Sequence, residues 1–418
     1  MSVGLAEMRA LAGRLYAAAV TAADPALAVR RHFERHPDPG VAGHSTLIAV
    51  GKAAPAMLAE AREHVRGPVT ALAVTHEGNE TTVPGARVLT ASHPVPSESG
   101  LQAGREILAL LDAAGAADRV LALISGGGSA LIPAPRAPLT LADKQAVNRL
   151  LLASGLDITA MNLVRQQLSE LKGGGFLRHA APAPVTGLIL SDVIGNELGA
   201  VASGPTTPPL GTRQDALALL TRHGLLEQLP AAVRTLLETP ETAAPLPAAE
   251  NHLIGSNEQS LQAMRDAVAP GWTARIVSDR LVGDVADAAA EIVRAAREAP
   301  ADRPTALIFG GETTVTLRGT GKGGRNQELA LRLAEAMRDW SGDWTFLSGG
   351  TDGRDGPTDA AGGLVDGGTM ARIAAAGQDM QALLANNDSH AALAAAGDLL
   401  LTGATGTNVA DVQVMLLN

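Results

Sequence analysis

The chain repeats one arrangement along its length: a short apolar run, a loop of small residues, and then a stretch with helical periodicity. Three such runs in the first half are Thr46–Val50, Val120–Ile124 and Val185–Leu190. A run as continuously apolar as Val120–Ile124 is expected of a strand that is buried on both faces. Strands that alternate with helices favour parallel pairing and right-handed crossovers. The sequence therefore predicts a layered α/β fold.

Length and one shift in composition predict two domains. With 418 residues, the chain is too long for one ordinary hydrophobic core. Residues 238–250 are rich in Pro, Ala and Thr and lack an apolar period, which is typical of a linker. We predict an α/β domain over residues 1–240, a linker over 241–250 and a second α/β domain over 251–418. Within the second domain we expect separate strands over Thr305–Phe309 and Thr313–Leu317.

Composition excludes several classes of function. A formal net charge of −10 and an aromatic content of 2% both weigh against a nucleic-acid-binding surface. The absence of cysteine excludes disulfides, thiolate zinc sites and a cysteine nucleophile. No segment approaches 18 apolar residues without charge, Gly or Pro, and Met1–Val20 is typical of an amphipathic helix rather than a signal peptide. We expect no membrane contact and a cytoplasmic location.

The loop Gly349–Gly362 directly follows the apolar run Trp344–Leu347 and combines many glycines with Asp352, Asp355 and Asp359. Glycines let the main chain approach a ligand closely, and the carboxylates can hold a hard cation through oxygen. The alternative interpretation is a tight turn whose aspartates only cap neighbouring backbone groups. The density of Gly and Asp after an apolar strand favours ligand binding.

Other apolar runs also end in polar loops of small residues. These loops are Gly51–Lys52, Ser125–Ser129, Ser191–Asp192, Gly255–Asn257 and Gly310–Glu312. In open α/β sheets, ligands bind outside the carboxyl ends of the strands. Because so many strand ends carry polar residues, we expect them to form a cleft between the two domains.

Two cations are candidates for binding an anion. Lys52 lies between a strand and a helix N-terminus, where its ammonium can reach an anion, although a Lys extended into solvent is the alternative. Arg325 precedes a helix and is suited to bidentate binding of carboxylate or phosphate. His93 precedes Pro94 at an expected strand end, which singles it out among the ten histidines, although an ordinary loop histidine is the favoured interpretation.

Two glycine-rich loops suggest phosphate or nucleotide binding. Ser125–Ser129 can form a concave set of N–H donors, although it lacks a P-loop signature and a nucleophile elbow. Gly319–Gly324 is a literal G-x-G-x-x-G, which supports a nicotinamide-dependent oxidoreductase as the alternative function. The preceding segment Thr313–Arg318 is half polar, however, and no clear acidic strand end follows. An anion-binding loop is therefore favoured there.

Several segments together resemble the glycerate 2-kinase family, whose C-terminal part is known as the MOFRL domain and some members of which are labelled hydroxypyruvate reductase. These segments are Gly51–Ala53, Leu123–Ala130, Ser191–Asn196, Ala202–Thr206, Gly310–Thr313, Gly323–Glu328, Thr351–Gly362 and Asn387–Ser389. The resemblance implies a Rossmann-like N-terminal domain, a smaller C-terminal α/β domain and an active site in the cleft between them. By this resemblance, Lys52 and Arg325 lie where the family has its active-site Lys and Arg.

The implied reaction is ATP-dependent phosphorylation of the 2-hydroxyl of D-glycerate to 2-phosphoglycerate. Such a reaction requires N–H donors, cations, and carboxylates that hold Mg²⁺, all of which the sequence supplies. The predicted nucleotide-binding residues are Ser125, Gly126, Gly127, Gly128, Ser129 and Asn257. The candidate Mg²⁺ ligands are Asp192, Glu312, Asp352, Asp355 and Asp359, of which the ion takes only one or two. The oligomeric state is left open, with a homodimer as one option.

Overall fold

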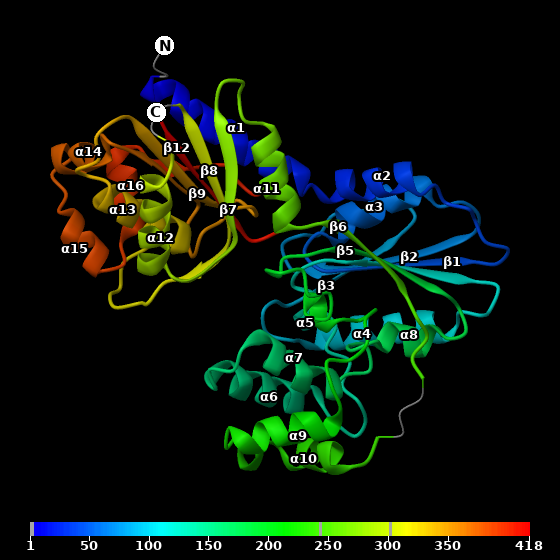
Figure 1. Cartoon of the computed structure of the whole chain (residues 1–418). Coiled ribbons are helices and arrows are strands. Elements are labelled where there is room, and N and C mark those ends of the chain that lie inside the picture. Colours follow the sequence, from blue (N-terminus) through cyan, green and yellow to red (C-terminus); the bar gives the residue numbers. More distant parts are fainter. Residues whose placement is uncertain (1–3, 242–244, 301–302) are drawn as a thin grey trace. The chain divides into compact units, whose positions relative to one another are not determined.

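The computed structural model describes residues 4–241, 245–300 and 303–418. The chain forms two compact units: one is Pro25–Ile254, and the other combines the chain up to Asp24 with Gly255–Asn418. Each unit contains one six-stranded sheet covered by helices (Figure 1). The predicted α/β class is confirmed for both units.

The sheet of unit Pro25–Ile254 has the strand order of a Rossmann fold, β3-β2-β1-β4-β5-β6. Its strands are β1 (Ser45–Val50), β2 (Val69–His76), β3 (Arg87–Ala91), β4 (Arg119–Ile124), β5 (Val185–Leu190) and β6 (Glu250–Gly255). The pairs β1–β2, β1–β4, β2–β3 and β4–β5 are parallel. Parallel pairing was predicted from the apolar runs and is confirmed.

Helices cover both faces of this sheet. They are α2 (Pro25–Arg35), α3 (Ala54–His64), α4 (Glu98–Asp112), α5 (Gly128–Leu131) and α8 (Gly175–Ala180). Because side chains alternate along a strand, Ile48 and Val50 share one core with Ile107 of α4 and Phe176 of α8. The opposite face is covered by α2 and α3 (Figure 1).

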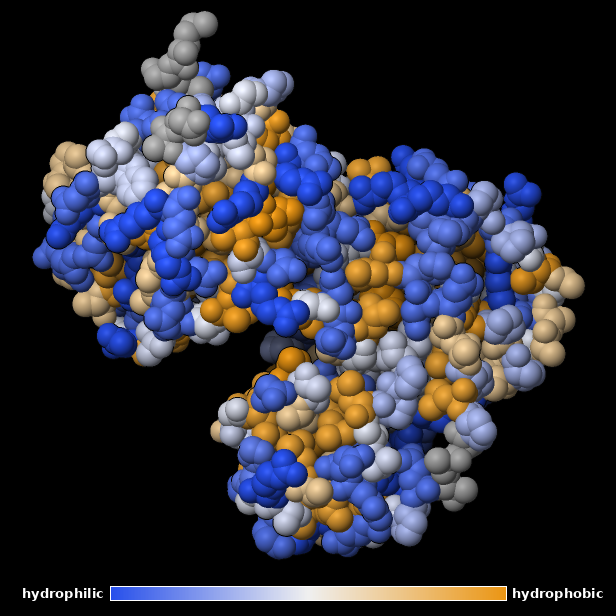
Figure 2. All heavy atoms as spheres, in the orientation of Figure 1, coloured by the Kyte–Doolittle hydropathy of each residue, from blue (hydrophilic) through white to orange (hydrophobic). Residues whose placement is uncertain are grey.

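A helical layer follows beneath α4 and α8, built from α6 (Leu141–Ala153), α7 (Ile158–Gln167), α9 (Arg213–Arg222) and α10 (Ala231–Glu238) (Figure 1). It has its own core, in which Val147 of α6 and Val164 of α7 pack with Leu220 of α9. Figure 2 shows hydrophobic surface on this layer, where Leu152 and Ile158 are 62% and 48% exposed. This layer of helices therefore lies on the side of the Rossmann sheet that α4 and α8 cover.

The second sheet is mixed rather than parallel, with the order β11-β10-β9-β12-β8-β7. Its strands are β7 (Thr273–Asp284), β8 (Thr305–Thr314), β9 (Trp344–Gly350), β10 (Gly362–Asp366), β11 (Leu399–Leu400) and β12 (Asp411–Leu417). Only the β7–β8 pair is parallel among the described pairings. The C-terminal strand β12 inserts antiparallel between β8 and β9.

Two helical layers cover the second sheet. The helices are α1 (Leu5–Ala22), α11 (Asn257–Asp266), α12 (Val285–Arg297), α13 (Arg325–Ala336), α14 (Thr369–Ala375), α15 (Met380–Ala385) and α16 (Ser389–Ala396). On one face, Leu15 of α1 and Leu261 of α11 pack with Ile308 of β8. On the other, Ile292 of α12 and Leu329 of α13 form a second core.

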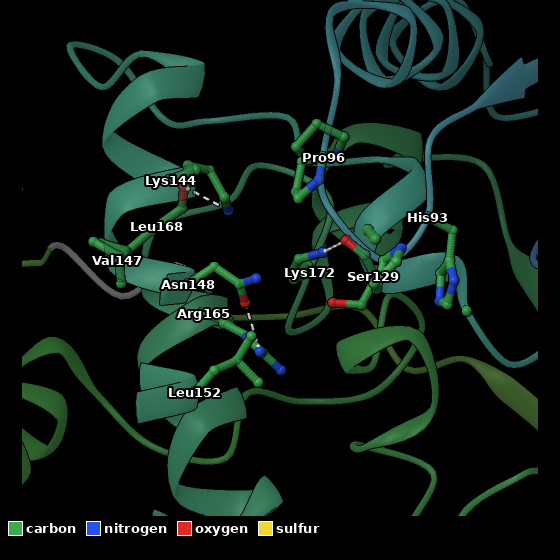
Figure 3. A pocket seen from close by; sticks show the side chains of 14 residues that line it. His93, Pro96, Ser129, Lys144, Val147, Asn148, Leu152, Arg165, Leu168 and Lys172 are labelled. Atoms are coloured by element: carbon green, nitrogen blue, oxygen red, sulfur yellow. Dashed lines mark hydrogen bonds between the residues drawn. The ribbon is translucent and has the colours of Figure 1, made fainter. Parts of the chain in front are cut away.

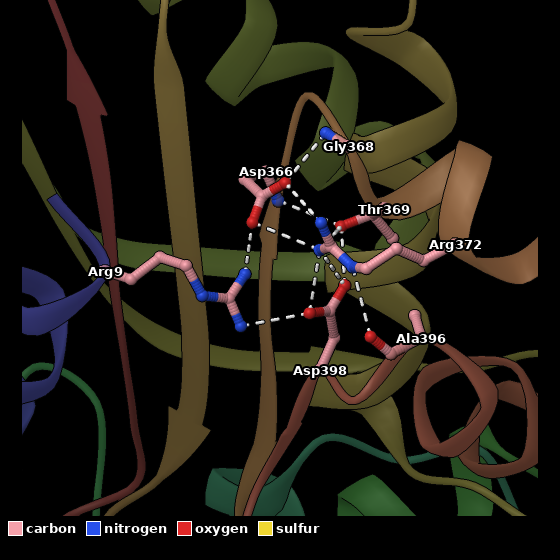
Figure 4. A network of polar contacts seen from close by, with 7 residues as sticks. All are labelled: Arg9, Asp366, Gly368, Thr369, Arg372, Ala396 and Asp398. Atoms are coloured by element: carbon pink, nitrogen blue, oxygen red, sulfur yellow. Dashed lines mark hydrogen bonds and ion pairs between the residues drawn. The ribbon is translucent and has the colours of Figure 1, made fainter. Parts of the chain in front are cut away.

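An ion-pair network fixes α1 to this unit (Figure 4). The Arg9 guanidinium binds the carboxylates of Asp366 and Asp398, both of which are buried. Arg372 binds the same two carboxylates at 3.0 and 2.8 Å. Each buried carboxylate is thereby shared between two arginines, which compensates its loss of hydration.

The compact units differ in two respects from the domains predicted from the sequence. Residues 4–24 associate with the C-terminal sheet, and β6, which the prediction divided between the linker and the second domain, belongs to the Rossmann sheet. The expectation of separate strands over Thr305–Phe309 and Thr313–Leu317 was wrong, since β8 continues through Gly310 and Gly311 to Thr314. No helix in the described part of the chain is long and apolar enough to cross a membrane.

Candidate functional site

The loops that contain Lys52 and Gly126 are joined at the carboxyl ends of β1 and β4. These strands are in register, with Val50 opposite Ile124, so their loops emerge side by side. The Lys52 N–H donates to the Gly126 carbonyl at 2.9 Å. Gly51 has a φ of 123°, and a Cβ there would lie 2.2 Å from Ser125 Oγ. Glycine is therefore required at position 51 for the two loops to approach so closely.

Ser125 links these loops internally. Its buried hydroxyl accepts from the Ala53 N–H at 3.2 Å and donates to the Val50 carbonyl at 3.3 Å. The nearby Ser129 hydroxyl lies 2.9 Å from that of Ser203. The predicted contact of both serines with a nucleotide remains a prediction, but the Ser125 side chain already has two partners within the protein.

Asp192 joins this group from the end of β5. A Cβ on Gly126 would lie 1.9 Å from Asp192 Oδ2, so the carboxylate packs directly on the Gly126 α-carbon. Burial raises the pKa of Asp192, while attraction to the Lys52 ammonium opposes the rise. Three strand ends thus bring together Lys52, the glycine loop and Asp192, three of the features that the sequence singled out.

His93 was interpreted as an ordinary loop histidine, yet it belongs to this group. Its ring carbon Cδ2 lies 3.4 Å from the Cβ position of Gly127, and Lys52 Cγ lies 3.2 Å from the same position. Burial lowers the pKa of His93, and repulsion from Lys52 adds to the effect. Its position after a strand end was the one cue in the sequence, but the contact itself depends on the tertiary packing of β3 beside β2.

A cavity of about 210 Å³ opens beside the glycine loop (Figure 3). Its lining includes His93, Gly127 and Ser129 from the strand ends. Helices α6 and α7 contribute Lys144 and Arg165, and the loop between α7 and α8 contributes Lys172; the sequence analysis identified none of these three. Lys144 and Arg165 lie on helices α6 and α7, where nothing local distinguishes them from solvent-exposed cations.

In the other unit, Arg325 and Asp411 form a bidentate ion pair. Arg325 begins α13, and its Nε and Nη2 donate to the two Asp411 oxygens at 2.6 and 3.0 Å. Arg325 Nη1 lies 2.9 Å from Glu312 Oε1. These contacts use three of the five N–H donors of a guanidinium, which leaves capacity for a further anion. Asp411 is fully buried and was missed because the strand that it begins, β12, was not anticipated from the sequence.

Asp355 caps α13. Its carboxylate accepts from the Asn326 and Gln327 N–H groups at 3.1 and 2.8 Å and from Gln327 Nε2 at 3.0 Å. Burial raises the pKa of Asp355 to about 6, with repulsion from Asp411 adding to the rise and the backbone hydrogen bonds opposing it. A Cβ on Gly324 would lie 2.3 Å from this carboxylate. Asp355 therefore caps backbone N–H groups, which was the alternative to ligand binding that the sequence left open for this loop.

The other aspartates of the Gly349–Gly362 loop also have partners within the chain. Asp352 Oδ1 accepts from the Arg354 N–H at 3.0 Å, and Asp359 pairs with His390 at 3.1 Å on the surface. Among the described residues, no group of three or more acidic or His side chains is arranged to hold a metal ion. Within this unit, Glu312, Asp352, Asp355 and Asp359 therefore form no such cluster, and the assignment of one or two of the five predicted ligands to Mg²⁺ remains a prediction.

Asn257 begins α11 and ties that helix to β12. Its Nδ2 donates to the Val409 and Asp411 carbonyls at 2.9 and 2.8 Å, while its buried Oδ1 has no partner among the described groups. A Cβ on Gly310 would lie 2.1 Å from that oxygen. The predicted role of Asn257 in nucleotide binding is not tested by these contacts.

The G-x-G-x-x-G loop is packed against its own chain. The Gly319 N–H donates to Asn387 Oδ1 at 3.1 Å and the Lys322 N–H to Asp388 Oδ1 at 3.1 Å. Added Cβ atoms on Gly319 and Gly321 would lie 2.4 and 2.5 Å from the Asn386 carbonyl oxygen. Here the glycines permit contact with residues 386–388, whereas a dinucleotide fingerprint requires that contact with pyrophosphate.

Comparison with known proteins identifies the same family over nearly the whole chain. Residues 11–238 match the domain of unknown function DUF4147, and residues 305–411 match the MOFRL family. A D-glycerate 2-kinase from Thermotoga maritima is 41% identical over 379 residues, covering 89% of this chain and 90% of that protein. A glycerate 2-kinase from Pyrococcus horikoshii is 38% identical, covering 98% of both chains.

A solved structure agrees. The crystal structure of glycerate kinase from Thermotoga maritima matches with a TM-score of 0.90 and 38% identity, covering 99% of this chain and 100% of that one. Because the match covers nearly all of both chains, it includes the Rossmann sheet and the mixed sheet. The chain therefore belongs to the glycerate kinase family, with the MOFRL fold as its C-terminal part.

Proposed function

We propose that this protein transfers the γ-phosphoryl group of ATP to the 2-hydroxyl of D-glycerate and releases ADP and 2-phosphoglycerate. Membership of the glycerate kinase family makes it a kinase that uses a nucleotide co-substrate. The observation that carries the proposal is the meeting of Lys52, Asp192 and the glycine loop at the ends of three parallel strands.

The arrangement suits phosphoryl transfer, which depends on positioning and on neutralising negative charge. Lys52 is half-buried, so its ammonium interacts with phosphate more strongly than a fully hydrated one would. Arg325 is held in place by Asp411, which reduces the entropy lost when its remaining donors bind an anion. We propose that residues of both units act in one reaction.

The predicted carboxylates would hold Mg²⁺, which would supply neutralisation of the negative charge on the nucleotide phosphates. Asp192 fits this role best among the five predicted ligands, because it lies at the strand ends beside the glycine loop and Lys52. Glu312 pairs with Arg325, and Asp352, Asp355 and Asp359 bind backbone groups or His390. One carboxylate is within the number that Mg²⁺ takes from a protein.

Reduction of hydroxypyruvate is the alternative, and a relative from Agrobacterium vitis that is 39% identical carries that activity in its provisional name. The packing of Gly319 and Gly321 against Asn386 weighs against it. One experiment separates the two: ADP release with D-glycerate, ATP and Mg²⁺, run beside NADH and NADPH oxidation with hydroxypyruvate at about 340 nm. We expect ADP release. Cofactor oxidation without ADP release would replace the kinase by the reductase.

A further inference from the structure

The cavity beside Gly127 is bounded by three cations whose polar partners are neutral (Figure 3). Lys172 Nζ donates to the Ser129 carbonyl at 2.5 Å, and Lys144 Nζ donates to the Leu168 carbonyl at 3.3 Å. Arg165 Nη2 donates to Asn148 Oδ1 at 2.6 Å. Among the described residues, none of the three cations forms an ion pair with a carboxylate.

Burial makes this cluster unfavourable without an anion. Lys172 and Lys144 are 2% and 8% exposed. Burial, followed by repulsion from Lys144 and Arg165, holds the pKa of Lys172 well below its usual range. Burial lowers the pKa of Lys144 to about 7, with repulsion from Arg165 and Arg136 adding to the shift and attraction to Glu170 opposing it. Cations buried without a partner destabilise a protein, so their grouping around one cavity indicates a ligand of opposite charge.

The cavity also adjoins the candidate active site. Gly127 lines it, and the Cβ position of Gly127 lies 3.2 Å from Lys52 Cγ. His93 lines the cavity, and its pKa is lowered by burial and, secondarily, by the same Lys52 ammonium. An anion bound by Lys172 therefore lies next to the residues proposed to carry out phosphoryl transfer.

We propose that Lys144, Arg165 and Lys172 bind a phosphate group of a reactant in this cavity, an inference that rests on the proposed kinase function. A terminal phosphate carries nearly two negative charges and offers several acceptor oxygens, which matches three cations around one cavity better than the single charge of a carboxylate does. Val147, Leu152 and Leu168 give the cavity an apolar wall for the uncharged part of the ligand. The phosphate comes either from the nucleotide or from the phosphorylated product.

Binding measurements on variants test this proposal. We expect Lys172→Met and Arg165→Met each to weaken the binding of pyrophosphate about tenfold or more, the scale of a lost hydrogen bond to a charged group. The control is Arg149→Met, which removes an exposed cation from the same helix as Lys144 and leaves the cavity unchanged. Parallel titrations with ADP and 2-phosphoglycerate identify the source, because the affected ligand is the one whose phosphate occupies the cavity.

Two further measurements keep the proposal falsifiable if a variant folds poorly. In the unmodified protein, pyrophosphate binding at pH 8 should take up protons, because an anion raises the pKa of Lys144 from about 7. In the absence of ligand, Lys172→Met should not lower the melting temperature, because it removes a buried unpaired charge. A structural role for Lys172 predicts the opposite.

The outcomes separate this proposal from the kinase proposal. A wild-type protein that forms no ADP with D-glycerate and ATP contradicts the kinase function itself. Full kinase activity with unchanged pyrophosphate, ADP and 2-phosphoglycerate binding in both variants overturns only the phosphate cavity. Weaker binding of D-glycerate alone also overturns it and makes the cavity a carboxylate site.

Discussion

Arg325 donates hydrogen bonds to both carboxylate oxygens of the buried Asp411, from Nε at 2.6 Å and from Nη2 at 3.0 Å. The sequence predicted that Arg325 binds an anion, and an arginine with that role alone would contribute little to folding stability. The ion pair changes that expectation, because removing the guanidinium leaves a fully buried carboxylate without its main partner. A residue proposed for catalysis is thus also part of the folded framework of its unit.

Arg325→Ala should therefore lower both activity and stability. We expect a loss of stability on the order of 2 kcal/mol, below the figure for a fully buried pair because Arg325 is partly exposed. Adding Asp411→Asn should restore much of the stability, since it removes the unpaired charge, while the activity stays low. Thermal unfolding and steady-state kinetics of both variants measure the two effects. Equal melting temperatures for wild type and Arg325→Ala would contradict the structural part of this role.

Lys52→Ala should lower activity alone. Its ammonium faces His93 and Asp192 rather than a tight ion pair, so its removal costs little folding energy. We expect kcat/KM to fall by about 100-fold or more, as for other lost charges at phosphoryl-transfer sites. Arg105→Ala, an exposed cation on α4, serves as the control. Activity of Lys52→Ala close to that of the control would remove Lys52 from the site.

Gly126→Ala tests the contact between the glycine loop and Asp192. A methyl group at this position would lie 1.9 Å from Asp192 Oδ2, so the carboxylate must move. We expect a loss of kcat/KM of about tenfold or more, because small misplacements in an active site are costly. Gly13→Ala in α1 is the matched control, since an added Cβ there meets nothing within 4 Å. Unimpaired turnover by Gly126→Ala would show that the position of Asp192 does not matter.

Asp355→Asn tests the capping carboxylate through its pH dependence. The folded-state pKa of about 6 exceeds the usual value of 3.8, so the folded state binds a proton more tightly than the unfolded state does. The contribution of Asp355 to stability therefore falls as the pH rises from about 4 to about 6, by up to about 3 kcal/mol. In the Asn variant, this pH-dependent change in the free energy of unfolding should be absent. Denaturant unfolding at about pH 4.5 and about pH 7 measures it in both proteins. An identical pH dependence in both proteins would show that Asp355 has an ordinary pKa.

The strands β1, β4 and β5 of the Rossmann sheet were predictable because each contains a largely apolar run that must be buried. Val120–Ile124 and Val185–Leu190 lie within or match β4 and β5. The strand β12 was not anticipated, since its position between β8 and β9 is a matter of long-range pairing. The attachment of α1 to the C-terminal sheet was also not predictable, because it includes ion pairs from Arg9 to Asp366 and Asp398, which are hundreds of residues away in the sequence.

The candidate site was predictable only where function follows a strand end. Lys52 and Asp192 were found because the carboxyl ends of parallel strands meet at one edge. Lys144, Arg165 and Lys172 were missed, because tertiary burial, and no local pattern, distinguishes them from ordinary surface cations. The density of aspartates in the Gly349–Gly362 loop favoured ligand binding in the sequence, but the role observed for Asp355 is helix capping.

Lys52 and Arg325 belong to different compact units, so their joint action is best tested by a double-mutant cycle. If both cations stabilise one transition state, Lys52→Ala combined with Arg325→Ala should lose less than the product of the single effects. If they act in independent steps or on separate ligands, the two losses should multiply. The cycle is measured as kcat/KM for D-glycerate at saturating ATP, with Arg105→Ala plus Arg325→Ala as the pair that should be additive. Strict multiplication of the Lys52 and Arg325 effects would contradict a shared transition state, even if each single variant is severely impaired.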